Sequence, residues 1–201
     1  SSAISPNDQQ MNDFENTLNN KKSLMSVRKL YLEKLALHDK KDSNYVCDKM
    51  PHNFLHMGLL LKALPEAKFI HVKRDPAATC WSNFKHYFSV NELGYSYDLK
   101  DNVNYFKLYQ DLMEFWDQQY GDHIYHLDYD QLTLDQEPVT RKLIQFLGLD
   151  WEDTCLSPQE NKRSVKTASQ QQVRQKVYTG SSQAWRKFEP YLDGAFGSLT
   201  P

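Results

Sequence analysis

The sequence predicts an α/β fold in three layers, with a central parallel sheet flanked by helices and an unusually large helical share. Short apolar runs alternate along the chain with longer stretches in which apolar residues recur every three or four positions. This alternation is typical of parallel strands joined by helical crossovers. The 201 residues, of which 40% are hydrophobic and 25% charged, are enough to bury one sizeable core. We therefore expect a polar N-terminal segment at 1–22 and one main domain at 23–201.

The N-terminal third is predicted to contain two helices separated by a short strand. Leu24, Val27 and Tyr31 lie at helical spacing within an amphipathic stretch at 22–38. Residues 45–47 form a short apolar run that we interpret as a strand. A mostly apolar helix is then expected over 54–64, with Asn53 as its N-cap.

A second strand and the start of a helix meet at Arg74. The apolar run at 69–73 predicts a buried strand. Asp75 is a typical helix N-cap, and Pro76 suits the first helical position because a missing N–H costs nothing there. The chain therefore places a guanidinium at the carboxyl end of a strand, beside a helix start.

The remaining elements follow from the same signals. Aromatic and aliphatic residues at helical spacing predict a long helix over 101–120, ended by Gly121. We further expect a strand over 123–129, a helix over 139–147 stopped by Gly148, and a last helical piece over 182–192.

The bulk composition narrows the expected location and partners. The net charge of −2 gives no reason to expect nucleic acid or an acidic membrane surface as a partner. No apolar run reaches the ~18 residues that would span a bilayer. Cys47, Cys80 and Cys155 are odd in number and widely spaced, which favours a reducing compartment over a disulfide framework or a zinc site. We therefore expect a cytoplasmic protein, of bacterial type, without membrane or nucleic-acid partners.

Two cations are candidates for binding a phosphorylated ligand. The carboxyl ends of parallel strands meet at one edge of a sheet, so Lys49, after the strand at 45–47, and Arg74 are expected at the same edge. Ser82 adds a hydroxyl about two helical turns after Arg74. A solvated cap or surface ion pair would also explain Arg74, and a local ion pair with Asp48 would equally explain Lys49.

Other motifs give weaker or negative signals. The chain contains neither a G-x-x-x-x-G-K-[ST] phosphate loop nor a G-x-S-x-G nucleophile motif. His52 and His56 share a helix face, but no third ligand accompanies them, so we interpret them as packing residues and expect no metal. The basic, hydroxyl-rich stretch at 162–169 suits phosphate oxygens, although a solvated loop would have the same composition.

Taken in order, these pieces resemble the sulfotransferase family, in particular the branch of protein-tyrosine sulfotransferases and of bacterial sulfotransferases joined to tetratricopeptide repeats. The match covers about residues 24 to 190. It includes the Asp-Lys-Met-Pro-x-Asn-Phe run at 48–54, the Phe-Ile-His run leading into Arg74-Asp75-Pro76, Tyr129-Asp130-x-Leu132, the Phe-Leu-Gly-Leu-x-Trp run at 146–151, the Asn-x-Arg-x-Val-x-Thr-Ala-Ser run at 161–169, Gln172-Val173-Arg174, and Tyr178-x-x-Ser181 with Trp185.

The resemblance implies a P-loop-like nucleotide fold and transfer of a sulfuryl group from 3′-phosphoadenosine 5′-phosphosulfate (PAPS) to a hydroxyl acceptor, without a metal. Arg74 and Ser82 correspond to the pair that grips the 3′-phosphate, and Tyr129 and Val173 to cofactor-binding residues. Lys49 corresponds to the lysine that stabilises the bridging oxygen of the leaving nucleotide, and Ser169 to the serine near the transferred group. The acceptor stays open between a tyrosine-containing peptide, a carbohydrate and a small phenol.

The sequence also departs from the family pattern. Ala184 stands where the family usually carries Lys or Arg. The chain resembles the C-terminal three quarters of a sulfotransferase domain, without the first strand, the 5′-phosphosulfate loop and the catalytic Glu. We therefore expect little activity from this chain alone, and a tetratricopeptide-repeat region as a further part of the full-length protein. Two alternatives remain, namely a non-catalytic nucleotide-binding or interaction domain derived from this fold and, less favoured, a nucleotide kinase.

Overall fold

The computed structural model describes residue 16 and residues 20–37, 44–88, 91–161 and 174–199. The chain divides into two compact units, Ser1–Ala67 and Lys68–Pro201, which are described separately. Across the described residues, no helix has the length and apolar character needed to cross a membrane.

The first unit is built from α2 (Lys21–Ala36), the 3₁₀ helix η1 (Pro51–His56) and α3 (Met57–Ala63). The Asn20 side chain caps α2 by accepting hydrogen bonds from the backbone N–H groups of Lys22 and Ser23. Arg28 then ties α2 to the end of α3, because its Nη1 donates to the Ala63 carbonyl at 3.2 Å and to Glu66 at 2.8 Å. The predicted helix at 22–38 is confirmed, with Asn20 as its N-cap.

Two expectations for this unit are wrong. Residues 45–47 are irregular rather than a strand, and Tyr45 and Val46 are exposed. An apolar run becomes a strand only where a neighbouring strand satisfies its backbone, and none is paired with it among the described residues. Asn53 does not cap a helix, because Pro51 opens a 3₁₀ turn before it and its side chain instead donates to Asp48 at 3.3 Å.

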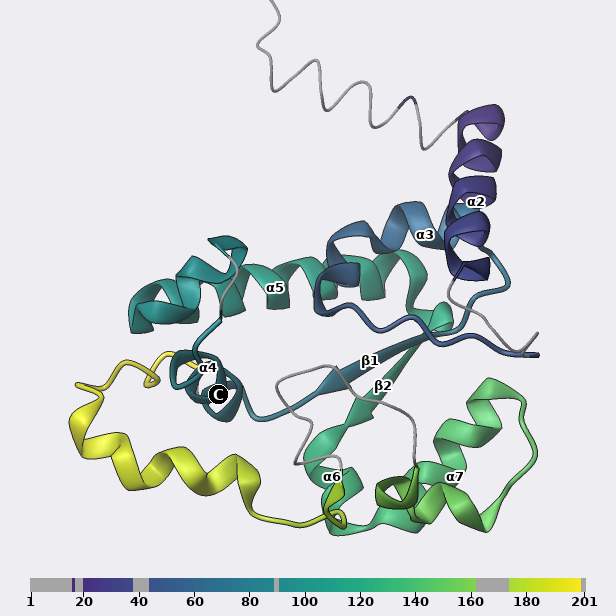
Figure 1. Cartoon of the computed structure of the whole chain (residues 1–201). Coiled ribbons are helices and arrows are strands. Elements are labelled where there is room, and N and C mark those ends of the chain that lie inside the picture. Colours follow the sequence, from purple (N-terminus) through teal and green to yellow (C-terminus); the bar gives the residue numbers. More distant parts are fainter. Residues whose placement is uncertain (1–15, 17–19, 38–43, 89–90, 162–173, 200–201) are drawn as a thin grey trace, which may run out of the picture. The chain divides into compact units, whose positions relative to one another are not determined.

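The second unit contains a parallel pair of strands, β1 (Phe69–Lys73) and β2 (Ile124–Asp128), which lie side by side in Figure 1. Their register pairs Phe69 with Ile124 and Lys73 with Asp128. Both strands were predicted, and the parallel direction is confirmed. The sheet is narrower than the central sheet of the three-layer fold that we expected, since only two strands pair in the described part of the chain. Ile70 and Val72 of β1 are consequently 39% and 54% exposed, whereas parallel strands in a wide sheet are buried on both faces.

Helices make up most of the second unit. They are α4 (Pro76–Phe84), η2 (Asn91–Tyr97), α5 (Leu99–Tyr120), η3 (Gly121–His123), α6 (Tyr129–Leu134), α7 (Gln136–Leu147), η4 (Asp153–Leu156), η5 (Pro158–Glu160) and η7 (Ser181–Tyr191). The predicted helices at 101–120 and 139–147 are confirmed with earlier starts, α5 being capped by the Asp98 side chain. The last element is 3₁₀ rather than α-helical and contains Pro190, which has no N–H to donate.

The core of the second unit joins α4, α5 and the C-terminal segment. Its buried members are Ala77, Ala78, Cys80, Val103, Trp185, Leu192, Phe196 and Leu199. The Asn102 side chain, 1% exposed, donates from Nδ2 to the Cys80 carbonyl at 2.9 Å and so fastens α5 to α4. Because Trp185 is buried in this cluster, the beginning of η7 is held against α4, immediately beside the end of β1.

Candidate functional site

The candidate site lies where β1 and β2 end. Lys73 pairs with Asp128 in the parallel register, so the next residues, Arg74 and Tyr129, leave the sheet at the same edge. The Arg74 guanidinium carbon lies 5.3 Å from the centre of the Tyr129 ring, a cation–π arrangement. The sequence predicted both residues for the site, and the sheet brings them together.

Two hydroxyls from the start of η7 complete this arrangement. Arg74 donates from Nε to the Ser182 hydroxyl at 2.9 Å, and Ser182 is only 4% exposed. The Ser181 hydroxyl lies 3.4 Å from the Tyr129 hydroxyl, at the long end of hydrogen bonding. We call Arg74, Tyr129, Ser181 and Ser182 the strand-end cluster. Its members come from segments more than fifty residues apart in the chain.

The turn after β1 is fixed by two carboxylates. Asp75 caps α4, its Oδ1 accepting the Ala78 N–H at 2.6 Å, and Pro76 occupies the first turn as predicted. The Asp75 N–H in turn donates to Oδ2 of Asp130 at 3.1 Å. This bond joins the residues that follow the two strands, so the direction in which Arg74 leaves β1 is determined by both strands.

The electrostatics of the cluster leave the guanidinium available to an anion. Arg74 forms no ion pair with any residue that the structure describes, and its one hydrogen bond there uses Nε. Its two terminal amino groups therefore keep donors for a ligand, in the planar arrangement that suits phosphate oxygens. At the start of α4 the Ala78 N–H already donates to Asp75, so this N–H is not available to a ligand.

Ser82 lies on α4 and is half-buried. Its hydroxyl makes no hydrogen bond to another described residue. As part of a helix that begins at the strand-end cluster, Ser82 presents a donor about two turns along α4 from the residue after Arg74.

Lys49 belongs to the first unit, where it is exposed in the irregular segment before η1. The local ion pair with Asp48 that would have explained this lysine is absent. Asp48 instead accepts hydrogen bonds from the Tyr31 hydroxyl at 2.7 Å and from Asn53 at 3.3 Å. Burial of the phenol and its bond to Asp48 raise the pKa of Tyr31 to about 12. Lys49 thus stays without an ion-pair partner within the described part of its unit.

Some predicted site residues fall elsewhere. Ser169 and Val173, with the basic stretch at 162–169, lie outside the described residues. Ser182 was not among the predicted site residues, and the only sequence signal for it is a pair of serines after Gly180. No group of three or more metal-binding side chains occurs in the part of the chain that the structure describes.

Comparison with known proteins shows which family the sequence matches. Residues 2–153 match the model of a family described as the sulfotransferase family. A protein of Aquifex aeolicus (strain VF5) described as an uncharacterized protein is 39% identical over 171 residues, which are 84% of this chain and 22% of that protein. Protein-tyrosine sulfotransferase 1 of Danio rerio is 26% identical over 147 residues, which are 68% of this chain and 38% of that protein. The chain therefore spans well under half the length of either relative.

Proposed function

The chain belongs to the sulfotransferase family, and from this premise we propose that it binds PAPS and serves sulfuryl transfer from that nucleotide to a hydroxyl acceptor. Members of this family generally use PAPS as the sulfuryl donor. The proposal assigns the 3′-phosphate to Arg74 of the strand-end cluster together with Ser82, and it assigns the transfer step to Lys49 and Ser169.

The observation that carries the proposal is the Arg74 guanidinium, held through Nε by Ser182 with its terminal amino groups free of carboxylates in the described structure. The oxygens of a phosphate accept hydrogen bonds, and a planar guanidinium can donate to two of them in a bidentate manner. In the proposed complex Arg74 and Ser82 bind the 3′-phosphate, and Tyr129 and Val173 contact the rest of the nucleotide. Ser182 keeps the guanidinium oriented.

The reaction requires charge stabilisation at two oxygens. The acceptor oxygen forms a bond to sulfur, the bond from sulfur to the bridging oxygen of the nucleotide breaks, and the acceptor proton passes to a base. The Lys49 ammonium would neutralise the negative charge that develops on the bridging oxygen, and the Ser169 hydroxyl would donate to the transferring group. Cations and hydroxyl donors can supply this stabilisation, by analogy with phosphoryl transfer.

The acceptor is proposed to be a tyrosine-containing polypeptide, with a carbohydrate hydroxyl as the second choice. The support is the similarity to a relative named protein-tyrosine sulfotransferase 1, over 68% of this chain. A tetratricopeptide-repeat region in the full-length protein, which we propose as its partner, would be suited to presenting an extended peptide.

Radiolabelled PAPS tests the proposal. The natural full-length protein is incubated with the nucleotide and with tyrosine-containing peptides or oligosaccharides, and transferred label is counted. Lys49→Ala should lower the transfer rate by ~100-fold or more, as the loss of one transition-state charge contact does in other enzymes. Lys142→Ala, which removes an exposed lysine from α7, is the matched control and should keep the wild-type rate.

Two outcomes would count against the proposal. Transfer that survives Lys49→Ala unchanged would remove Lys49 from the reaction. Binding of the nucleotide without transfer to any acceptor would instead favour a non-catalytic nucleotide-binding domain derived from the same fold, as the substitution at Ala184 would allow.

A further inference from the structure

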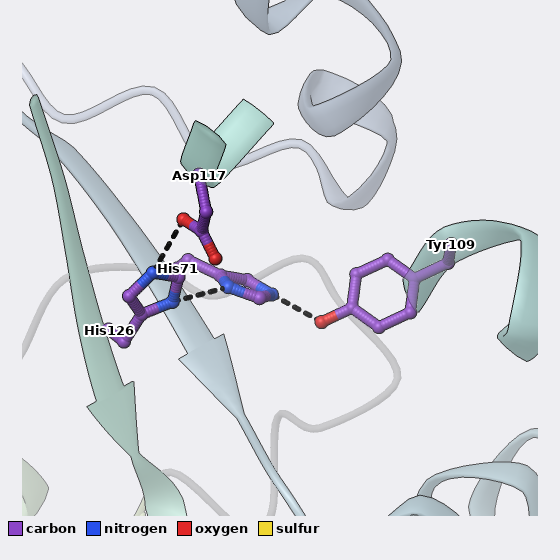
Figure 2. A network of polar contacts seen from close by, with 4 residues as sticks. All are labelled: His71, Tyr109, Asp117 and His126. Atoms are coloured by element: carbon purple, nitrogen blue, oxygen red, sulfur yellow. Dashed lines mark hydrogen bonds and ion pairs between the residues drawn. The ribbon is translucent and has the colours of Figure 1, made fainter. Parts of the chain in front are cut away.

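Four polar side chains form a continuous network at the middle of the strand pair, and Figure 2 shows them meeting between the two strands and α5. His71 of β1 and His126 of β2 are direct partners in the register, and their Nδ1 atoms lie 2.9 Å apart. His126 Nε2 lies 2.8 Å from Oδ1 of Asp117, and His71 Nε2 contacts the Tyr109 hydroxyl. Tyr109 and Asp117 both belong to α5.

Only one arrangement of protons satisfies this network when both imidazoles are neutral. The Asp117 carboxylate can only accept, so His126 donates from Nε2 and must accept at Nδ1. His71 therefore donates from Nδ1 to His126 and accepts at Nε2 from the Tyr109 O–H. All three hydrogen bonds run in the same direction, from Tyr109 towards Asp117.

One added proton reverses the direction of part of this hydrogen-bonded network, and a second proton breaks the network. A proton on Nδ1 of His126 makes that ring donate to His71, so His71 must donate from Nε2 to the Tyr109 oxygen. A second proton puts N–H groups on both Nδ1 atoms across a 2.9 Å gap and places two positive rings in contact. Burial, the nearby His126 and Lys73 lower the pKa of His71 to about 4, against a smaller opposing effect of Asp117.

The network lies on the same two strands that lead to the strand-end cluster, so it can influence that cluster. His71 of β1 lies three residues before Arg74 in the chain, and His126 of β2 lies three residues before Tyr129. We propose that His71, His126, Asp117 and Tyr109 form a proton-sensitive lock, which holds β1 in register beside β2 and thereby positions Arg74 against Tyr129. The four residues are positioning residues, and the effect on ligand binding rests on the proposed function.

The lock has a definite response to pH. The titratable and charged groups facing His71 are His126 of β2, Tyr109 and Asp117 of α5, and Lys73 of its own strand. Tyr109, whose pKa burial raises to about 12, stays protonated throughout the range considered. The unfolded chain takes up a proton on His71 near its ordinary pKa of about 6.5, whereas the folded chain does so near 4. Stability conferred by the lock is therefore complete above about pH 6.5 and falls as the pH drops towards 4.

The first arm of the test observes the imidazoles directly in the unmodified chain. In the network with both rings neutral, long-range proton–nitrogen NMR spectra should show His71 as the Nδ1–H tautomer and His126 as the Nε2–H tautomer. His71 should resist protonation until about pH 4. His71 in the opposite tautomer, or titrating near 6.5, would overturn the lock.

The second arm compares variants. In His71→Asn, the amide can still donate to His126 but cannot be protonated. Its midpoint of thermal unfolding should change less between about pH 7 and pH 5 than that of the wild type. His123→Asn removes an exposed histidine next to β2 and should follow the wild type. Identical pH dependence in the wild type and His71→Asn would overturn the proposal.

The third arm measures adenosine 3′,5′-bisphosphate binding against pH. The ligand's own phosphate titrates near pH 6 and weakens binding to every variant, so the comparison is between variants. On acidification to about pH 3, one unit below the pKa of folded His71, the wild type and His123→Asn should lose roughly tenfold more affinity than His71→Asn. If no variant binds the nucleotide at any pH, the proposed function and the link to the site both fail, and the first two arms still decide the lock.

Discussion

Arg74 donates from Nε to the hydroxyl of Ser182, a residue 108 positions later in the chain. The bond joins the carboxyl end of β1 to the start of η7, and Ser182 is buried where it forms. Its position depends on the core of the second unit, because Trp185, one 3₁₀ turn further on, is packed among residues of α4 and α5. The packing of the C-terminal segment therefore orients the guanidinium of a residue in the middle of the chain.

Replacing Ser182 with alanine should loosen Arg74 without removing it. The loss of this hydrogen bond is expected to cost about 1–2 kcal/mol of unfolding free energy, since it involves a charged donor. Affinity for adenosine 3′,5′-bisphosphate should fall by ~5–10-fold, because the unanchored guanidinium must be ordered on binding. Calorimetry and chemical denaturation measure the two effects. Ser198→Ala, at an exposed serine of the same segment, should change neither.

Asn102 is predicted to be more important for the stability of the fold than for ligand binding. Its buried side chain is the polar tie between α5 and the backbone of α4 at Cys80. Asn102→Ala should lower the free energy of unfolding by about 1–3 kcal/mol, because the amide bond is lost and a small cavity remains. Urea denaturation tests this prediction, with the exposed Asn104→Ala of the same helix as the control. Equal losses in the two variants would contradict the structural role of Asn102.

Gly148 ends α7 in the left-handed region, with φ of 72°. A Cβ atom there would meet no neighbouring atom within 4 Å, so any penalty of Gly148→Ala comes from the backbone alone. We expect a loss of about 1 kcal/mol of stability. Gly121, also in open space, has a helical φ of −51°, so Gly121→Ala should be neutral or slightly stabilising. A neutral Gly148→Ala in thermal unfolding would contradict this account.

Local signals in the sequence correctly predicted the helix ends that depend on neighbouring residues. Asp75 and Pro76 at the start of α4 and Gly148 at the end of α7 act through neighbours within a few residues, and all three are where the sequence placed them. The parallel strands also carry a strong local pattern. Their parallel direction brings Arg74 and Tyr129 to one edge, whereas the sequence predicted Lys49 beside Arg74 at that edge.

Contacts between distant segments were harder to predict. Nothing near Ser182 indicates that it meets Arg74, since their distance depends on how η7 packs on α4. Likewise, His71 and His126 each occupy an ordinary strand position, and their pairing depends on a register that no single segment encodes. The run at 45–47 shows the converse, because apolar residues alone do not supply a strand with a partner.

The central claim is that Arg74 recognises a 3′-phosphate, and the most direct test is calorimetric binding of adenosine 3′,5′-bisphosphate and of 5′-AMP to the chain. The wild type should prefer the bisphosphate by ~10–100-fold, as expected for one charge-assisted bidentate contact of about 1.5–3 kcal/mol. Arg74→Ala should bind both nucleotides equally weakly, whereas Arg141→Ala, at an exposed arginine of α7, should keep the preference. Equal affinity of the wild type for the two nucleotides, or a preference that survives Arg74→Ala, would contradict the account.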